Sequence, residues 1–197
     1  GYKIGLIGTI HNRIGEETFP VERTTPEALD LQELFFRMVE AGVDYCVMEV
    51  SSHALSLQRV AYSEFDLGVF TNISQDHLDF HQTLDDYLAA KEKLFTQLGQ
   101  PGAKRGTKAA VINVDDPRGR EVAGRCPVPC LGFGLGEEAD LRAVDVEMGL
   151  QGVKFTARGQ GKELHLNLKL TGIFSVYNAL AAIAVGLTEG IEPEVIA

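Results

Sequence analysis

The feature that most constrains the fold is a series of short apolar runs that alternate with helical patterns. The runs lie at residues 2–8, 45–50, 66–71, 108–114 and 128–133. Between them, residues 25–42 and 83–98 carry apolar side chains at helical spacing, and Asp115-Asp116-Pro117 is typical of a helix start. Strands that are apolar on both faces need helices on both sides. The sequence therefore predicts an α/β fold with a mostly parallel sheet flanked by helices.

The pattern changes near residue 139. Residues 141–150, 152–157 and 163–170 alternate polar and apolar side chains. This alternation predicts an antiparallel β meander appended to the sheet at about 139–171. An Ala-rich helix over 172–190 follows, and Glu192-Pro193-Glu194 begins another. We find no long linker and no internal repeat, so we expect one domain over 1–197, truncated at its N-terminal edge because the first strand has no lead-in.

The ends of the first helix carry recognisable signals. Thr25 can cap a helix that has Pro26 at its first position, whereas Thr24 with Glu27 would form a capping box one residue earlier. Gly42 is the expected stop.

Charge and apolar length restrict the possible partners. The 197 residues include 18 Lys+Arg and 28 Asp+Glu, a net charge of −10, which disfavours binding to nucleic acid or to an anionic membrane. No apolar run approaches the roughly 20 residues that span a bilayer, and the amino end does not resemble a signal peptide. We expect a cytoplasmic protein without an obligate protein partner.

The three cysteines, Cys46, Cys126 and Cys130, fit neither a disulfide framework nor the spacing of zinc knuckles. We expect buried, inert thiols, because free cysteine is commonly buried.

Polar residues follow two of the predicted strands, where open parallel sheets place their ligand sites. Glu49 ends the run 45–50, and an acidic residue there is costly to bury unless it is paired or bound to a metal. The alternative is that Glu49 reaches solvent while Ser51 or Ser52 caps a following helix.

The segment 71–81 holds two histidines, two aspartates and an asparagine. This density suggests a divalent-ion site, and His77 and His81, four residues apart, would share one helix face as a zinc pair does. The alternatives are a polar loop, or a metal-dependent hydrolase built on Asp76, His77 and His81.

Lysines and glycines give weaker signals. Lys91, beside two alanines, fits a solvated lysine on an amphipathic helix when only its neighbours are considered. The strict Gly-x4-Gly-Lys-[Ser/Thr] phosphate loop is absent. The glycine-rich segments 102–108 and 159–163 are better interpreted as turns.

Taken together, these segments resemble the central domain of the Mur ligases, which has a P-loop-NTPase-like fold. The resemblance extends over nearly the whole chain in order and spacing. The segments on which the resemblance rests are residues 22–26, 48–53 with Arg59-Val60, Thr71-Asn72 with 76–79, Ala89-Ala90-Lys91, 111–116, and 172–174 with 178–182.

The resemblance implies a set of site residues. It implies that Glu49 and His77 hold Mg²⁺ and that Lys91 is carbamylated, which would replace a cation that repels the metal by an anion that attracts it. It implies that the side chains of Thr24, Thr25, Ser51 and Arg59 contact a UDP-sugar dipeptide, and that Asn72 and Asn178 lie near the nucleotide.

The implied reaction has two steps. ATP phosphorylates the glutamate γ-carboxylate of UDP-MurNAc-L-Ala-D-Glu, and the amine of a diamino acid attacks the acyl phosphate, extending a peptidoglycan precursor. Mg²⁺ offsets the charge of the phosphoryl group. The sequence leaves open whether the diamino acid is meso-diaminopimelate or lysine.

Three departures from the family pattern limit this expectation. The glycine-rich ATP loop and the carboxy-terminal domain are missing, and Ser175 stands where asparagine is common. We therefore expect the chain to be part of a ligase. We expect the chain by itself not to turn over ATP. A noncatalytic module that binds a UDP-sugar or nucleotide is the remaining alternative.

Overall fold

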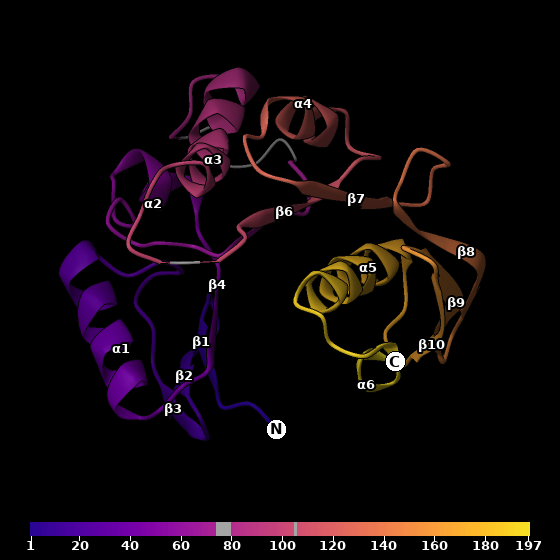
Figure 1. Ribbon diagram of the computed structural model, residues 1–197, viewed down its shortest axis with the longest axis horizontal. Coiled ribbons are helices and arrows are strands. Elements are labelled where there is room, and N and C mark those ends of the chain that lie inside the picture. The colour runs from indigo at the N-terminus through magenta and orange to yellow at the C-terminus, as the bar shows by residue number, and fades with distance from the viewer. Residues whose placement is uncertain (74–79, 105) are drawn as a thin grey trace. The chain divides into compact units, whose positions relative to one another are not determined.

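The computed structural model describes residues 1–73, 80–104 and 106–197, which fall into two compact units. Unit 1 comprises Gly1–Ser63 and His77–Lys93, and unit 2 comprises Glu64–Asp76 and Leu94–Ala197. The expectation of a single domain over 1–197 stays a prediction. Figure 1 follows the chain from its indigo amino end to its yellow carboxyl end.

Unit 1 is built on a four-stranded sheet with the order β3-β2-β1-β4. The strands are β1 (Ile4–Ile7), β2 (Asn12–Ile14), β3 (Glu17–Phe19) and β4 (Tyr45–Met48). β1 runs parallel to β4, whereas β2 is antiparallel to both β1 and β3. The sequence did not predict β2 and β3, because three-residue strands without an apolar run leave no periodic signal.

Helix α1 (Ala28–Glu40) buries Leu31 and Met38. It begins later than expected, with Glu27 as its N-cap and no side-chain cap, so both predicted caps are wrong; the hydroxyl of Thr25 is used elsewhere, as described below. The predicted stop is confirmed. Gly42 has a φ of +67°, and the amide of Val43 donates to the carbonyl of Met38 at 2.9 Å, which is a Schellman ending.

Two more helices contribute to unit 1. The short helix α2 (Ser52–Ser56) has Ser51 as its N-cap, and the hydroxyl of Ser51 accepts a hydrogen bond from the amide of Ala54. This confirms that a capped helix follows β4. Helix α3 (Leu84–Leu98) runs from unit 1 into unit 2, and the hydroxyl of Thr83 caps it by accepting from the amide of Asp86 at 3.1 Å.

Unit 2 contains a six-stranded sheet with the order β10-β9-β8-β7-β6-β5. The strands are β5 (Leu67–Phe70), β6 (Ala109–Asn113), β7 (Cys130–Gly134), β8 (Leu141–Gly149), β9 (Gly152–Gly159) and β10 (Lys162–Leu168). β5 to β8 are parallel, and β8 to β10 are antiparallel. The predicted α/β class and appended meander are confirmed. The expectation of one common sheet is not met, because β1 and β4 belong to the sheet of unit 1.

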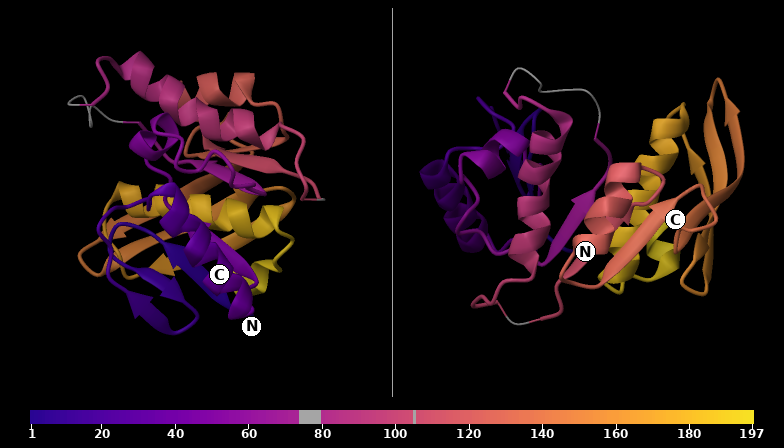
Figure 2. Two further views of the ribbon diagram at one scale, coloured as in Figure 1. Left: turned by 90° about the vertical axis from the view of Figure 1, so that its left-hand side faces the viewer. Right: turned by 90° about the horizontal axis from the view of Figure 1, so that it is seen from above.

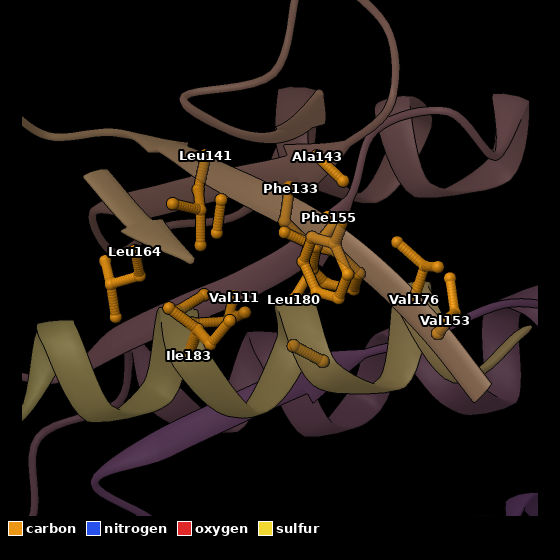
Figure 3. Packing of buried hydrophobic residues seen from close by; sticks show 13 residues of the cluster. Val111, Phe133, Leu141, Ala143, Val153, Phe155, Leu164, Val176, Leu180 and Ile183 are labelled. Atoms are coloured by element: carbon orange, nitrogen blue, oxygen red, sulfur yellow. The ribbon is translucent and has the colours of Figure 1, made fainter. Parts of the chain in front are cut away.

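The core of unit 2 lies between this sheet and helix α5 (Ile173–Thr188). Val176, Leu180 and Ile183 on α5 point toward Phe133 and Phe155 on the strands (Figure 3). Each of these side chains is at most 3% exposed, and burying one of them stabilises the fold by about 1.5–3 kcal/mol. Helix α4 (Pro117–Arg125) lies on the other side of β6 and β7 (Figures 1 and 2), and α6 (Pro193–Ile196) follows α5.

Two further expectations concern the surface. Within the described ranges, no helix is both long and apolar enough to cross a membrane. The expectation that the cysteines are buried is wrong for Cys46 and Cys130, which are exposed, while Cys126 is partly exposed. Cys46 is exposed because β4 is the last strand of its sheet, and Cys130 because it is the first residue of β7.

Candidate functional site

The carboxyl ends of β1 and β4 form the edge on which the candidate site of unit 1 is built. Because the two strands are parallel, Thr9 after β1 and Glu49 after β4 emerge at the same edge. The Thr9 hydroxyl donates to Oε2 of Glu49 at 2.7 Å and lies 3.1 Å from the Thr24 hydroxyl. Glu49 is exposed, so its carboxylate is oriented by one hydroxyl and remains open to a ligand.

Thr25 fastens the loop before α1 to this edge. Its hydroxyl is fully buried, donates to the backbone carbonyl of Glu49 at 2.8 Å and accepts from the amide of Ser51 at 3.0 Å. This explains why Thr25 does not cap α1. The threonine was expected to contact a substrate, but its hydroxyl is used inside the protein, where it positions Glu49 and Ser51.

Arg59 holds the same loop from α2's side. Its Nη1 donates to the carbonyl of Thr25 at 3.2 Å, and its Nη2 pairs with Glu27 at 2.9 Å. The side chain is only 12% exposed, and within the described part of the chain its buried Nε has no hydrogen-bond partner. The structure thus brings Thr24, Thr25, Ser51 and Arg59 together with Glu49, and their contact with a substrate stays a prediction.

Lys91 on α3 lies near Glu49. Burial lowers the pKa of Lys91, and the negative charge of Glu49 opposes this shift. The Lys91 ammonium lies 5.2 Å from the ring centroid of Tyr87, one helical turn earlier. The expectation of a solvated lysine, drawn from its neighbours alone, is wrong, because the amphipathic pattern gave no sign of this enclosure.

A cluster of rings supports the lysine. Tyr87 is buried and stacks on His81, with ring centroids 5.1 Å apart and an interplanar angle of 19°. His81 is 5% exposed and also contacts the rings of His53 and Phe80. His81 precedes α3, which begins at Leu84. The expectation that it lies on a helix face is therefore wrong, because the helix begins three residues later.

The remaining residues of this segment cannot be placed. His77 and Asp76 lie outside the described residues. Within residues 1–73, 80–104 and 106–197, no group of three or more His, Cys, Asp or Glu side chains could hold a metal ion. The metal-ligand and catalytic roles of Glu49, His77 and Lys91 therefore stay predictions.

Two functional candidates were missed by sequence reasoning. Thr9 directly orients Glu49. The sequence signal that could have indicated it is its position: Thr9 follows the first predicted strand closely, just as Glu49 lies at the end of the second. Tyr87 was assigned only to the apolar face of a helix. The i,i+4 spacing to Lys91 could have suggested their contact, because residues four apart are neighbours on a helix.

Unit 2 has its own polar edge at the carboxyl ends of β5 and β6. The Asn113 amide donates to the carbonyl of Thr71 at 2.8 Å, and Asp116 both caps α4 and accepts from the amide of Ile73 at 3.0 Å. The two residues expected near a nucleotide, Asn72 and Asn178, are exposed on this unit. Their role stays a prediction.

Asp115 is the most heavily bonded carboxylate on this edge. It accepts from the amides of Leu135 and Gly136, at 2.6 and 3.1 Å, and from the Tyr177 hydroxyl at 2.8 Å. Burial, together with the hydrogen bond and charge of Asp115, raises the pKa of Tyr177 to about 12. A Cβ added at Gly134 would lie 2.6 Å from an oxygen of Asp115, so a glycine is required there.

Parallel α/β sheets place their ligand sites, often for nucleotides, at such strand-end edges. Comparison with known proteins identifies the family. Residues 1–186 match the Mur ligase middle domain. The chain therefore belongs to the Mur ligase family.

Individual relatives point to one branch of that family. A UDP-N-acetylmuramoyl-L-alanyl-D-glutamate–2,6-diaminopimelate ligase from Caldanaerobacter subterraneus is 49% identical over 183 residues, 93% of this chain and 36% of that protein. The ligase of the same name from Bacillus cereus is 46% identical over 196 residues, 100% of this chain and 40% of that protein. A solved structure of such a ligase superimposes with a TM-score of 0.87 at 28% identity, covering 99% of this chain and 39% of that one.

Proposed function

We propose that this chain is the middle part of a MurE-type ligase, which uses ATP to join 2,6-diaminopimelate to UDP-MurNAc-L-Ala-D-Glu in peptidoglycan synthesis. The chain spans about 36–40% of the length of these bacterial relatives. The observation that carries the proposal is the exposed Glu49 carboxylate, which the Thr9 hydroxyl orients at a strand-end edge, in a chain 46–49% identical to ligases of that name. The cytoplasmic location expected from the sequence stays a prediction.

The residues on this edge are compatible with Mg²⁺. Mg²⁺ prefers oxygen ligands and is usually held by one or two carboxylates in phosphate-transferring sites. Glu49 supplies an exposed carboxylate that the Thr9 hydroxyl orients, and Lys91 would supply further oxygens as a carbamate. When bound, the ion would offset negative charge on the transferring phosphoryl group.

The environment of Lys91 favours the chemistry that a carbamate requires. Only the neutral amine can attack the carbon of CO₂, forming an N–C bond and releasing a proton. Burial lowers the pKa of Lys91, so a larger fraction of the amine is neutral at a given pH. Tyr87 lies against the lysine and restrains its position.

The polar residues around Glu49 have two different roles in the proposed substrate binding. We assign Thr24 and Ser51 to direct contact with the UDP-sugar dipeptide, because both are only partly buried beside Glu49. Thr25 and Arg59 hold the loop that carries them, since their polar groups bond to the chain itself. Asn72 and Asn178 are assigned to the nucleotide.

The test is an assay of the full-length ligase that contains this chain. We expect phosphate release and a tripeptide product, detected by mass spectrometry, with ATP, Mg²⁺, UDP-MurNAc-L-Ala-D-Glu and 2,6-diaminopimelate. Replacing 2,6-diaminopimelate by lysine should give little product. Product with lysine alone would contradict the assigned amino acid, and absence of product with either would contradict the ligase assignment.

A parallel measurement addresses the chain by itself. We expect no substrate-dependent phosphate release from the 197-residue chain, because the glycine-rich ATP loop is not in it. Calorimetry with UDP-MurNAc-L-Ala-D-Glu then shows whether it binds without turnover. Substantial ATP turnover by this chain would contradict the expectation that turnover requires the glycine-rich ATP loop.

A further inference from the structure

A set of packed rings in unit 1 connects helix α2 to helix α3. His53 lies on α2, Phe80 and His81 precede α3, and Tyr87 is in the first turn of α3. The ring of His81 stacks on Tyr87 with centroids 5.1 Å apart, and it lies 5.8 Å from the ring of His53. Phe80 packs against both histidines, at centroid distances of 4.0 and 4.9 Å. We call these four residues the ring cluster, in which His81 joins the two helices.

The central rings of the cluster are firmly held. His81 is 5% exposed and Tyr87 is 6% exposed, so neither ring can turn without displacing its neighbours in a close-packed interior. An aromatic side chain has only two torsions to fix and loses little entropy when it is ordered. The ring cluster is therefore a stiff connection between α2 and the start of α3.

Lys91 lies at the far end of this connection. In a helix, a long side chain points back over the turn before its own residue, and the Lys91 ammonium accordingly lies 5.2 Å from the centroid of the Tyr87 ring. Lysine has a flexible four-carbon stem that would otherwise sample many positions. Because Tyr87 is itself backed by His81, the position of the lysine nitrogen depends on two stacked rings.

Helix α2 is fixed beside the other candidate ligand. The amide of its N-cap, Ser51, donates to the Thr25 hydroxyl, which donates in turn to the carbonyl of Glu49. The ring cluster joins this fixed helix to the helix that carries Lys91. It thereby relates the position of the Lys91 nitrogen to that of the Glu49 carboxylate, the two groups that must face one ion in the proposed site.

We propose that His81 and Tyr87 are positioning residues, whose stacked rings hold the Lys91 side chain where a carbamate on it faces the strand-end edge. The proposal rests on the carbamylated lysine of the proposed function. In that step the neutral amine forms a bond to the carbon of CO₂, one electron pair of a C=O bond moves onto oxygen, and the proton of the nitrogen passes to water. Neither ring reacts, so the ring shape matters and the imidazole nitrogens and the phenol oxygen do not.

The first test measures the carbamate directly in the full-length ligase. With ¹³C-labelled bicarbonate, the wild type should show a carbamate signal by ¹³C NMR, and Lys91→Arg, which cannot form one, should lack it. His81→Leu and Tyr87→Leu should need about 10-fold more bicarbonate for the same signal, because a misplaced reacting group loses at least this much. His81→Phe and Tyr87→Phe keep a ring and should retain the wild-type signal.

Steady-state kinetics give a second readout. In the two leucine variants, kcat should fall by about 10-fold at low bicarbonate and recover when bicarbonate is added in excess. KM for UDP-MurNAc-L-Ala-D-Glu should stay within about 2-fold of the wild type, since substrate binding does not use these rings. A loss that comes only from a weakened fold would not respond to bicarbonate.

Phe95→Leu is the matched control. Phe95 also lies on α3, is 3% exposed and follows Lys91 by four residues. Its ring faces Phe70, with centroids 6.3 Å apart, and the lysine points toward the opposite end of the helix. This variant should unfold at a lower urea concentration, with the bicarbonate dependence of its carbamate signal unchanged.

Three results would overturn the proposal. One is an unchanged carbamate signal in both leucine variants. Another is a signal lost in a folded His81→Phe, which would show that an imidazole nitrogen is needed and which decides even if His81→Leu does not fold. The third is an active wild-type ligase without any carbamate signal, a result that leaves the ligase assignment intact. Absence of the tripeptide product from the wild type contradicts the proposed function instead.

Discussion

Two carboxylates sit at strand-end edges in the two units, and they differ in how their negative charge is satisfied. Asp115 in unit 2 accepts three hydrogen bonds, two from backbone amides and one from Tyr177. Glu49 in unit 1 is exposed and takes one hydroxyl donor, from Thr9, with Lys91 nearby. The same position in the fold thus serves structure in one unit and leaves a charge open to a ligand in the other.

This difference shows why a strand-end carboxylate is not by itself a functional signal. A saturated carboxylate has little capacity to bind anything else, and removing it leaves its donors without their acceptor. An unsaturated one contributes little to folding and can attract a cation. Variants of the two residues should therefore fail in different ways.

The largest effect is expected for Glu49→Gln. Loss of the charge should lower kcat of the full-length ligase by about 100-fold or more, because the site then lacks the anion that would hold Mg²⁺. Stability should change by no more than about 0.5 kcal/mol, since Glu49 is exposed. Steady-state kinetics and urea denaturation measure the two.

Glu40→Gln, at the exposed end of α1, removes the same charge away from the edge and should retain activity. Full activity in Glu49→Gln would contradict the contrast between the two carboxylates.

The converse result is expected for Asp115→Ala. Three hydrogen bonds are lost and the amides of Leu135 and Gly136 lose their acceptor, so the free energy of unfolding should fall by about 2–4 kcal/mol. Urea denaturation monitored by circular dichroism measures this loss.

Two further variants test the structural role of Asp115. Tyr177→Phe removes only one of the three bonds and should cost about 1 kcal/mol, and it should remove the phenol ionisation at about pH 12 from an ultraviolet titration. Glu138→Ala, at an exposed position, should leave stability unchanged. Equal losses in Asp115→Ala and Glu138→Ala would refute the structural role.

Within unit 1, variants of Thr25 and Thr24 distinguish a residue that holds the loop in place from one assigned to substrate contact. Thr25→Val keeps the shape but leaves the Glu49 carbonyl and the Ser51 amide unpaired, so it should cost about 1–3 kcal/mol. Thr24→Val loses only the contact with Thr9 and should cost less than about 0.5 kcal/mol. Thermal or urea denaturation of the pair compares them, and the reverse order would contradict the assignment.

The smallest effect is a shift in the titration of Lys91. Its pKa, followed by NMR after ¹³C-methylation, should lie below the ordinary 10.5, and Glu49→Gln should lower it further because the Glu49 charge raises it. Between the lowered pKa and 10.5 the unfolded chain binds more protons, so this lysine contributes stability that rises with pH. A pKa that rises in Glu49→Gln would show that the two groups are not neighbours.

Much of the fold was readable from the sequence. The five apolar runs predicted β1, β4, β5, β6 and β7 within a few residues, and the alternation after residue 139 predicted the meander. Asp116 before Pro117 and Gly42 after α1 were read correctly because capping and left-handed turns depend on local chemistry. β2 and β3, with three residues each, were too short to leave a pattern.

The candidate site was readable only in outline. The resemblance selected Glu49, Thr24, Thr25, Ser51, Arg59 and Lys91, and the structure brings the first five together with Lys91 close to Glu49. It could not show that Thr25 and Arg59 are engaged inside the chain, or that Thr9 orients Glu49. Those facts depend on which hydroxyl meets which carbonyl across segments far apart in sequence.

The sequence by itself therefore determined most of the element types, the end of α1 at Gly42 and the start of α4 at Pro117, because apolar periodicity and side-chain chemistry are local properties. Only the tertiary structure decided which of the polar groups are hydrogen-bonded within the protein and which remain accessible to a ligand. It partly buried Lys91 near Glu49 and gave Asp115 three hydrogen-bond donors. Desolvation and hydrogen-bond partners are set by neighbours in space, and the linear order of the residues does not contain them.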